Sequence, residues 1–346
     1  MRALCLTATG GPEHLALLDI PSPPLTRPDE VRIGVRAVAL NHLDLWVADG
    51  LPAVPIPAFP HVVACDAAGV VLEVGPAVRH VAVGDRVVIN PGYGCGECEA
   101  CRLGEEIFCR GYGVLGEHRS GTAAEEIVVP GRTVLPIRGE WSWPEAAAFT
   151  LSTLTAWRML TTRAALRRDE IALIWGIGGG VALQALQIAR HLGARAAVTS
   201  SSDAKLTRAA ALGAEVGVNH ATTDDVAGAV KRHFGRGVDV VVDSVGTPTW
   251  SQSLRAIRPG GRLVCCGATA GHDVALDLRR LFWFQWSLLG STMGTAREFA
   301  EIVALGDAGA LRPVIDAVHP LAEGALAYRR LADAGQFGKL VLEVAP

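Results

Sequence analysis

Ile171-Ala-Leu-Ile-Trp175-Gly-Ile-Gly-Gly-Gly180-Val-Ala-Leu-Gln-Ala-Leu-Gln-Ile-Ala-Arg190-His-Leu-Gly-Ala194 is the stretch that decides the fold. Its first five residues form a short apolar run typical of a strand buried on both faces, and residues 181–191 carry apolar side chains at helical spacing. The glycines between them would let backbone approach a phosphate, and the first helical turn would aim N–H groups at it. Residues 195–199 offer the second strand that a βαβ unit requires. The stretch therefore predicts a turn that holds a dinucleotide pyrophosphate.

This stretch has two other interpretations. Residues 171–189 carry no charge and are nearly long enough to span a bilayer, but four glycines, Gln184 and Gln187 argue against a membrane helix. The second alternative is a strand–helix corner of another α/β protein, in which the glycines serve packing alone.

Length and composition set the class of protein. A chain of 346 residues exceeds what one hydrophobic core usually supports, so two domains are expected. The net charge of −3 gives no electrostatic reason to expect nucleic acid or a membrane as partner. The start of the chain does not resemble an export signal, which predicts a cytoplasmic, reducing location where clustered cysteines indicate metal rather than disulfides.

Short β-rich segments separated by Gly/Pro turns fill the first 130 residues or so, and they predict an antiparallel, barrel-like domain. These segments are residues 31–38, 69–74, 86–89 and 123–129.

Helical patterns follow at residues 146–149 and 154–166, and strands then alternate with helices from Ile171 onward. The strands fall near 171–175, 195–199, 215–218, 238–242 and 262–266, with another possible near 287–291. Such alternation predicts an α/β fold with a doubly wound parallel sheet. Beyond Glu298 there are two more helical patterns and a last strand at residues 339–344.

Four cysteines give the most specific signal in the chain: Cys95, Cys98, Cys101 and Cys109, spaced x2, x2 and x7 on a glycine-rich loop. Four thiolates spaced this tightly can close a tetrahedron around zinc and leave no open position, which indicates one structural zinc ion. Redox switching and an iron–sulfur cluster are the competing interpretations.

The cysteine lobe, the glycine stretch, Gly237-Val-Asp-Val-Val-Val-Asp-Ser-Val-Gly246, Pro259-Gly-Gly-Arg-Leu-Val and Gly338-Lys-Leu-Val-Leu342 occur in the order seen in medium-chain dehydrogenases/reductases. The chain thus resembles the zinc alcohol dehydrogenase and quinone oxidoreductase superfamily over essentially its whole length. The resemblance implies a GroES-like substrate domain at residues 1–152 and 292–346, with a zinc lobe at about 92–112. It also implies a Rossmann domain at residues 153–291.

The chain departs from this family where a catalytic zinc would be bound. The family's Cys, His and Cys ligands fall on Asn41, Cys65 and Leu151, and the acidic residue of the His-Glu pair falls on Asp66. An amide, a thiol and an isobutyl group cannot hold zinc as a Lewis acid. A site rebuilt from Cys65, Asp66 and a nearby histidine is the alternative.

Three neighbouring residues are the candidates for catalysis: Asn41, His42 and Asp44. The Asn41 amide can donate to a substrate oxygen, and the resemblance places it in the site. His42 titrates near neutrality and, by resemblance, could contact the cofactor pyrophosphate instead. Asp44 is expected to orient its neighbours. Each of the three can also be an ordinary turn or helix cap.

The cofactor is predicted to be NADPH rather than NADH. The glycine motif resembles the quinone oxidoreductase variant, and Ser200 stands where an acidic residue would select NAD. Lys205 and neighbouring hydroxyls could bind a 2′-phosphate, while Asp203 is expected to cap a helix. The residues expected to contact the cofactor are Thr155, Gly176, Gly178, Gly179, Gly180, Val181, Ser200, Ser201, Lys205, Gly246, Gly267 and Lys339.

These features predict an NADPH-dependent oxidoreductase that transfers hydride to a small apolar carbonyl or activated C=C substrate. The alternatives are a zinc-dependent alcohol dehydrogenase with a rebuilt site and a low-turnover nucleotide-binding protein. Residues 288–294 resemble an edge strand, and Trp283, Phe284 and Trp286 precede it, so a homodimer or tetramer is expected.

Overall fold

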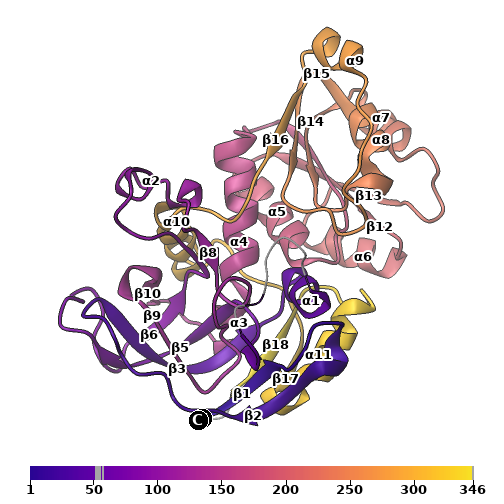
Figure 1. Ribbon diagram of the computed structural model, residues 1–346. Coiled ribbons are helices and arrows are strands. Elements are labelled where there is room, and N and C mark those ends of the chain that lie inside the picture. Colours follow the sequence, from indigo (N-terminus) through magenta and orange to yellow (C-terminus); the bar gives the residue numbers. More distant parts are fainter. Residues whose placement is uncertain (51–55, 57, 345–346) are drawn as a thin grey trace. The chain divides into compact units, whose positions relative to one another are not determined.

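The computed structural model describes residues 1–50, 56 and 58–344. The chain divides into two compact units, Met1–Leu154 with Gly294–Pro346 and Thr155–Met293. Figure 1 shows both, and each is described by itself below. No helix in the described ranges is both long and apolar enough to cross a membrane.

The first unit is built on a mainly antiparallel sheet with the strand order β10-β6-β5-β3-β18-β17, to which β9 adds by pairing with β3. A smaller sheet, β2-β1-β4, and a two-stranded sheet, β7-β8, accompany it. The strands are β1 (Arg2–Leu6), β2 (Leu15–Asp19), β3 (Glu30–Ala39), β4 (His61–Val62), β5 (Asp66–Val74), β6 (Arg86–Ile89), β7 (Gly92–Tyr93), β8 (Gly113–Val114), β9 (Glu126–Pro130), β10 (Val134–Pro136), β17 (Ile315–Pro320) and β18 (Lys339–Glu343).

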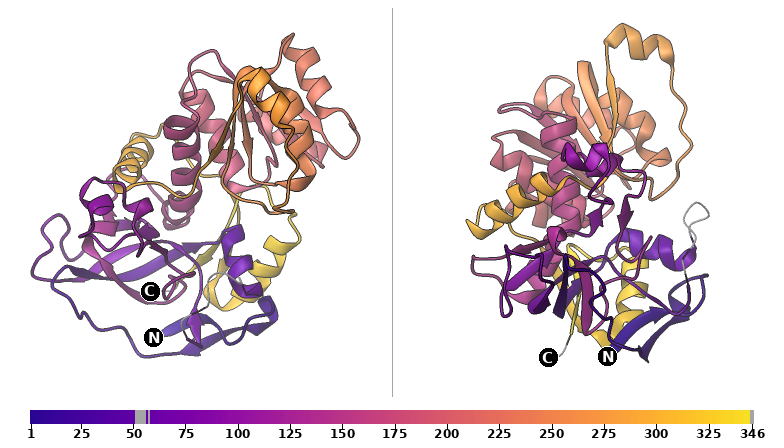
Figure 2. Two further views of the ribbon diagram at one scale, coloured as in Figure 1. Left: turned by 45° about the horizontal axis from the view of Figure 1, so that its top comes forward. Right: turned by 60° about the vertical axis from the view of Figure 1, so that its left-hand side comes forward.

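The two ends of the chain meet in this unit. Helix α11 contacts strand β2, and strand β18 pairs with β3, so segments from both ends of the sequence lie side by side (Figure 2). Its helices are α1 (His42–Asp49), α2 (Glu99–Arg102), α3 (Trp143–Ala148), α10 (Ala296–Asp307) and α11 (Gly324–Ala332), with short turns η1 (Pro12–His14), η2 (Glu106–Phe108), η3 (Gly131–Thr133) and η5 (Leu321–Glu323). The sequence did not predict β17, which pairs parallel with β18.

The second unit contains a parallel sheet with the strand order β13-β12-β11-β14-β15-β16. Its strands are β11 (Ile171–Ile174), β12 (Arg195–Ser200), β13 (Val216–Asn219), β14 (Val238–Asp243), β15 (Ile257–Cys265) and β16 (Ser287–Gly290). The order reverses at β11, which is the arrangement of a doubly wound Rossmann sheet. The predicted α/β fold class is confirmed.

Helices α5 (Gly180–His191), α6 (Asp203–Ala211), α7 (Val226–Phe234), α8 (Thr247–Ala256) and α9 (Leu278–Phe284) connect these strands. Helix α5 packs on β11 and β12, while α7 and α8 lie beside each other (Figure 1). The central strands β11 and β14 are entirely buried, which explains why they are mostly apolar runs in the sequence.

The helix predicted at residues 154–166 is divided in the structure. Helix α4 covers Thr150–Trp157, and a π-helical segment covers Arg158–Arg163. The hydroxyl of Thr161 donates to the carbonyl oxygen of Trp157 at 2.7 Å, which inserts a side chain into the backbone ladder. Such insertions are a known cause of irregular helix geometry, and hydrophobic periodicity does not reveal them.

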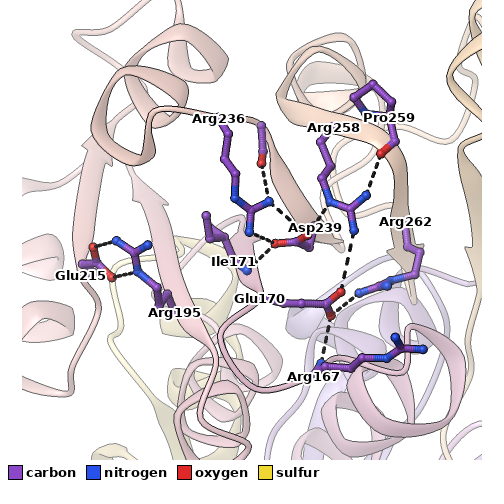
Figure 3. A network of polar contacts seen from close by, with 11 residues as sticks. Arg167, Glu170, Ile171, Arg195, Glu215, Arg236, Asp239, Arg258, Pro259 and Arg262 are labelled. Atoms are coloured by element: carbon purple, nitrogen blue, oxygen red, sulfur yellow. Dashed lines mark hydrogen bonds and ion pairs between the residues drawn. The ribbon is translucent and has the colours of Figure 1, made fainter.

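A network of charged side chains lies at the amino ends of the parallel strands (Figure 3). Asp239 is 2% exposed and accepts from the backbone N–H of Ile171, from the two terminal guanidinium nitrogens of Arg236 and from Arg258. Glu170 accepts from Arg262 at 2.5 Å. Ligands of such sheets bind at the carboxyl ends of the strands, so this network stabilises the fold and is not part of the cofactor site.

Candidate functional site

The four cysteines of the predicted zinc lobe meet in the structure. Their sulfur atoms all lie within 4.8 Å of one another, and the Sγ atoms of Cys95 and Cys101 are 3.9 Å apart. A tetrahedral zinc ion with Zn–S bonds of about 2.3 Å would hold its sulfurs roughly 3.8 Å apart, so the cluster has the right size. Gly94 precedes the loop, and a Cβ atom there would come within 2.7 Å of the Cys101 sulfur.

The backbone of the lobe is arranged for thiolates. The N–H groups of Cys95 and Gly111 donate to the Cys109 sulfur at 3.3 Å, and that of Gly96 donates to Cys101 at 3.3 Å. Backbone donors lower the pKa of Cys95 to about 6, whereas partial burial and neighbouring thiols raise the pKa of Cys101 to about 12. A bound zinc ion would supply the charge that lets all four lose their protons.

The candidate catalytic residues lie at one end of strand β3. Ala39, the last residue of β3, pairs with Val341 of β18 on one side and with Asp66 of β5 on the other. This register brings Asn41, two residues after the end of the strand, next to Asp66 and to Lys339 at the start of β18. All three side chains are at least nine-tenths buried.

Asp66 is the centre of this group. Its Oδ1 accepts from the Thr150 hydroxyl at 2.5 Å and from the Leu151 backbone N–H at 2.8 Å. Its Oδ2 accepts from Asn41 Nδ2 at 2.9 Å and from Lys339 Nζ at 3.1 Å. Four donors thus compensate a carboxylate that is 0% exposed, as a buried charge requires.

Asn41 and Asp44 begin helix α1 with a capping box. The Asn41 N–H donates to Asp44 Oδ2 at 2.6 Å, and Asp44 is 3% exposed. Burial raises the pKa of Asp44 to about 7, although the Asn41 backbone and the charge of Lys339 oppose the shift. Asp44 therefore has a structural role as a helix cap, and it shares a buried environment with the other polar groups.

Cys65 and Tyr328 complete the buried polar group. The Cys65 thiol lies 3.8 Å from Asp44 Oδ1, and burial raises its pKa well above the usual value, so it stays protonated. Tyr328 of α11 is 0% exposed, and its hydroxyl has no hydrogen-bond partner among the described residues. Sequence reasoning did not identify Tyr328, because an aromatic side chain on an apolar helix face gives no separate signal.

The histidines near this stretch do not join the group. His42 is exposed and packs its ring edge-on against Trp46, with centroids 5.2 Å apart. His61 is buried and bonds through Nε2 to the Gly116 carbonyl at 2.9 Å. In the described ranges the four-cysteine lobe is the only set of three or more His, Cys, Asp or Glu side chains that could hold a metal ion. The alternative of a rebuilt zinc site with Cys65, Asp66 and a histidine therefore has no structural support.

The glycine loop of the second unit follows β11 and leads into α5. Gly176 has a φ of 70°, and its N–H donates to the Thr199 hydroxyl at 3.2 Å. Gly179 is the N-cap of α5. A Cβ atom at Gly176 or Gly179 would meet only one neighbouring atom each within 4 Å, at 3.9 and 3.7 Å, so space for a ligand adjoins the backbone here.

Strand β12 ends at Ser200, which is 5% exposed and accepts from the Ser202 N–H at 3.1 Å. Ser202 caps α6 by accepting from the Lys205 N–H. Asp203 accepts from the Asn219 side chain at 2.8 Å. The strand ends in Ser200 rather than in an acidic residue, and the next acidic residue in the sequence, Asp203, accepts a hydrogen bond from Asn219.

Asp243, the last residue of β14, stabilises the loop that follows this strand through hydrogen bonds. Its Oδ1 accepts from the N–H groups of Val245 and Gly246, and its Oδ2 accepts from the hydroxyls of Thr249 and Ser253 at 2.8 Å. Gly246 has a φ of 95°, and a Cβ atom there would collide with a backbone oxygen 2.0 Å away, so glycine is required.

Most of the other residues expected to contact the cofactor lie in the loops that follow the parallel strands or at the start of α5. Gly178, Gly180 and Val181 belong to the glycine loop and the first turn of α5, Ser201 follows β12, and Gly267 follows β15. Thr155 of α4 is buried with a hydroxyl that lacks a partner in the described part of the chain, as a ligand contact would need. Lys339 belongs to the first unit, where its ammonium group bonds to Asn41 and Asp66, and its contact with the cofactor stays a prediction.

Two family models match the chain. The model described as alcohol dehydrogenase GroES-like domain matches residues 27–139, and the one described as zinc-binding dehydrogenase matches residues 180–308. The NAD-dependent alcohol dehydrogenase of Sulfolobus acidocaldarius is 30% identical over 99% of this chain and 100% of its own length. The chain belongs to the zinc-type alcohol dehydrogenase family. It is an NAD(P)-dependent oxidoreductase of the medium-chain dehydrogenase/reductase type, and it carries the family's zinc-binding cysteine cluster.

Other relatives within this family carry different names. The acryloyl-coenzyme A reductase of Metallosphaera sedula is 30% identical over 90% of this chain and 92% of its own length. The spectinabilin polyketide synthase system protein NorB of Streptomyces orinoci is 35% identical over 92% of this chain, which spans 13% of that protein's length.

Solved structures of family members superpose closely on the chain. A crystal structure of an NAD-dependent alcohol dehydrogenase has a TM-score of 0.94 and 42% identity, covering 100% of both chains. The 2-octenoyl-CoA carboxylase reductase in complex with NADP and 2-octenoyl-CoA has a TM-score of 0.91 and 29% identity, covering 99% of this chain and 87% of that one.

Proposed function

We propose that this member of the family is an NADPH-dependent reductase that transfers hydride to an enone, quinone or related carbonyl substrate without a zinc ion in the chemical step. One observation carries the proposal: the polar group around Asn41 holds an amide, a thiol, two carboxyl groups and an ammonium group. Leu151 contributes only its backbone N–H to this group. Such a set can orient and stabilise an oxygen but has no open metal position.

The end of strand β12 supports the choice of NADPH. Ser200 would not repel a 2′-phosphate, and Lys205 lies in the first turn of α6 beside it. NADP is bound by the carboxylase reductase that superposes on this chain, whereas other relatives are named NAD-dependent. The relatives named for acyl-CoA reduction favour C=C reduction over alcohol oxidation.

The glycine loop and the polar group around Asn41 would have different roles in the reaction. When bound, NADPH supplies the hydride. The glycine loop and the first turn of α5 would hold its pyrophosphate, because backbone N–H groups there are not used within the helix. Asn41 would face the substrate oxygen with an amide donor, while Asp44 holds the start of α1 and Asp66 fixes Asn41 in place.

The zinc ion in the cysteine lobe would have a structural role only. The four sulfurs would close the coordination sphere and leave no position for water or substrate. A cysteine cluster that binds metal rather than forming disulfides suits a reducing compartment, and we therefore propose a cytoplasmic location.

Measured turnover tests this function. NADPH oxidation with a panel of enones and quinones should be faster than alcohol oxidation with NADP or NAD, and added zinc should not change either rate. Zinc-stimulated alcohol oxidation would instead establish a zinc alcohol dehydrogenase. Tight NADPH binding without turnover on any substrate would indicate a nucleotide-binding protein.

A further inference from the structure

The ammonium group of Lys339 lies inside the polar group rather than at its surface. The side chain is 5% exposed, and Nζ donates to Asn41 Oδ1 at 2.5 Å and to Asp66 Oδ2 at 3.1 Å. A buried cation is costly unless it is paired and hydrogen-bonded, and here both conditions are met. The charge is therefore held between two atoms, the side-chain oxygen of Asn41 and one carboxylate oxygen of Asp66.

This contact decides which way the Asn41 amide points. An ammonium group has donors only, so the oxygen of the amide must face it and the NH2 group must face away. The NH2 group lies 2.9 Å from Asp66 Oδ2, 3.3 Å from Cys65 Sγ and 3.4 Å from the Ala39 carbonyl. One of its two hydrogens thus has a strong acceptor. The other has only a weak thiol and a long contact.

We propose that Asn41 relays the charge of Lys339 to the substrate oxygen. Hydrogen bonds in a chain polarise one another, so a cation on the amide oxygen makes the amide N–H groups stronger donors. The weakly bonded N–H would exchange the Cys65 sulfur for the substrate oxygen, and Asp66 would keep the other. Lys339 then acts as a positioning residue through Asn41.

The inference rests on the proposed function, and its chemical step balances. When bound, NADPH would supply the hydride for the new C–H bond and would leave as NADP+. The π electrons would move to the substrate oxygen, where the Asn41 N–H would meet the negative charge, and a proton from water would complete the reduction. The charge of Asp66 opposes the relay, but Thr150 and Leu151 offset it by donating to the other carboxylate oxygen.

A set of variants tests the relay in the holoenzyme. Lys339→Met removes the charge at similar length, Lys339→Arg keeps it, and Asn41→Ala removes the relay. We expect Lys339→Met to lower kcat roughly tenfold to hundredfold, as loss of an oxyanion donor does, with the Kd for NADPH unchanged. Arginine should restore part of the rate. The double variant Asn41→Ala/Lys339→Met should be no slower than Asn41→Ala alone.

Several outcomes would overturn the relay. Additive losses in the double variant would show that Lys339 does not act through Asn41. A raised Kd for NADPH with unchanged kcat would make Lys339 a cofactor contact. If Lys339→Met does not fold, Lys339→Met/Asp66→Asn leaves the group neutral and must show the same fall in kcat. A wild-type protein without turnover overturns the proposed function as well, whereas an active wild type with additive losses overturns the relay alone.

Discussion

Lys339 and Asp66 lie 273 residues apart in the sequence, yet the ammonium nitrogen and a carboxylate oxygen approach to 3.1 Å in the core of the first unit. The pair joins β18, which the end of the chain supplies, to β5, which comes from its first quarter. Lys339 is the first residue of this strand and is followed by three buried apolar residues, 340–342; among the described residues its ion pair is with Asp66. The pair therefore links the folding of the C-terminal segment to the site.

The first prediction concerns the stability of this pair. Lys339→Met leaves Asp66 buried without its cation, and breaking a buried ion pair in this way costs about 3–5 kcal/mol of unfolding free energy. Adding Asp66→Asn should recover part of the loss, because the remaining carboxylate charge is removed. Denaturant unfolding of the two variants measures both effects. Lys231→Met, on an exposed face of α7, is the control and should unfold like the parent. Equal losses in the single and double variants would contradict a charge pairing.

The second prediction concerns pH. The pKa of Asp44 is about 7 in the folded protein and 3.8 in the usual reference, so the folded state binds the extra proton between these values. Folding stability must then fall as the pH rises from about 4 to above 7, by up to ~4 kcal/mol for a shift of this size. The titratable groups that face this carboxyl group are Asp66, Lys339, Cys65 and Tyr328.

Asp44→Asn removes the titration while keeping an oxygen that can accept from the Asn41 N–H. The difference in unfolding free energy between parent and variant should therefore grow in favour of the variant as the pH rises through this window. Asp333→Asn, an exposed carboxylate after α11, should leave the pH dependence of the parent unchanged. Parallel stability curves for the parent and Asp44→Asn would rule out a buried, protonated Asp44.

The third prediction concerns the zinc lobe. Purified protein should hold one zinc ion per chain at Cys95, Cys98, Cys101 and Cys109. Cys98→Ser should abolish zinc binding and lower the melting temperature, because metal binding contributes directly to the folding of such lobes. Elemental analysis and thermal unfolding check this, with Cys265→Ser as a thiol control outside the lobe. A second tightly held zinc ion per chain would instead support a zinc-dependent alcohol dehydrogenase.

The sequence was sufficient for some of these features because their signals are local. Alternating strands and helices give the parallel sheet, and the spacing of the cysteines brings four sulfurs within reach of one ion. By contrast, the site around Asn41 depends on the register of β3 with β5 and β18. Register between distant strands is set by the packing of the whole unit, and no window of sequence contains it.

Lys339 is the clearest example of a contact that depends on strand register and could not be predicted from the sequence. The sequence placed it among the cofactor contacts, whereas its ammonium group lies against Asn41 and Asp66. A lysine within a buried apolar strand is itself a signal, since lysine is almost never fully buried without a partner. That signal predicts a carboxylate nearby but cannot say which one.

The fourth prediction concerns the cofactor. NADPH should bind more tightly than NADH, because Ser200 presents no carboxylate to a 2′-phosphate and Asp203 is held by Asn219. Lys205→Ala should narrow the difference in affinity between NADPH and NADH, because it removes a charge-assisted contact with the 2′-phosphate of roughly 1.5–3 kcal/mol. Ser200→Asp should reverse the preference. Fluorescence titration with both cofactors measures this, and Lys231→Ala on α7 is the control. Equal affinities in the parent would contradict this role of Ser200.

The last prediction concerns association through the edge of the parallel sheet. Strand β16 pairs with β15 on one side only among the described strands, which leaves an edge that a second copy could extend. Of the aromatic residues preceding it, Trp286 is 8% exposed and packs in the core, while Trp283 is 75% exposed. Leu278 and Phe282 are also exposed, at 66% and 68%.

Helix α9, which precedes the edge strand in the sequence, therefore exposes three large apolar side chains that a monomer would rarely leave open to water. Two copies related by a two-fold axis could join their β16 strands and cover these side chains in one isologous contact. Arg163 already donates to the carbonyl oxygen of Gly290 at 2.8 Å, so this oxygen is not available to a second strand. The segment that pairs between two copies would therefore lie before Gly290. Leu288 packs toward the core, which places Leu289 on the opposite face of the strand.

Light scattering should thus report at least twice the mass of one chain at micromolar concentration. Leu289→Lys should shift the protein toward monomer, because a charge on an edge strand opposes pairing. Trp283→Lys should weaken the dimer as well if α9 shares in the contact. Val83→Lys changes an exposed residue in a turn of the first unit and should leave the mass unchanged. A monomeric parent would contradict the dimer, and a dimer that survives both edge variants would place the contact elsewhere.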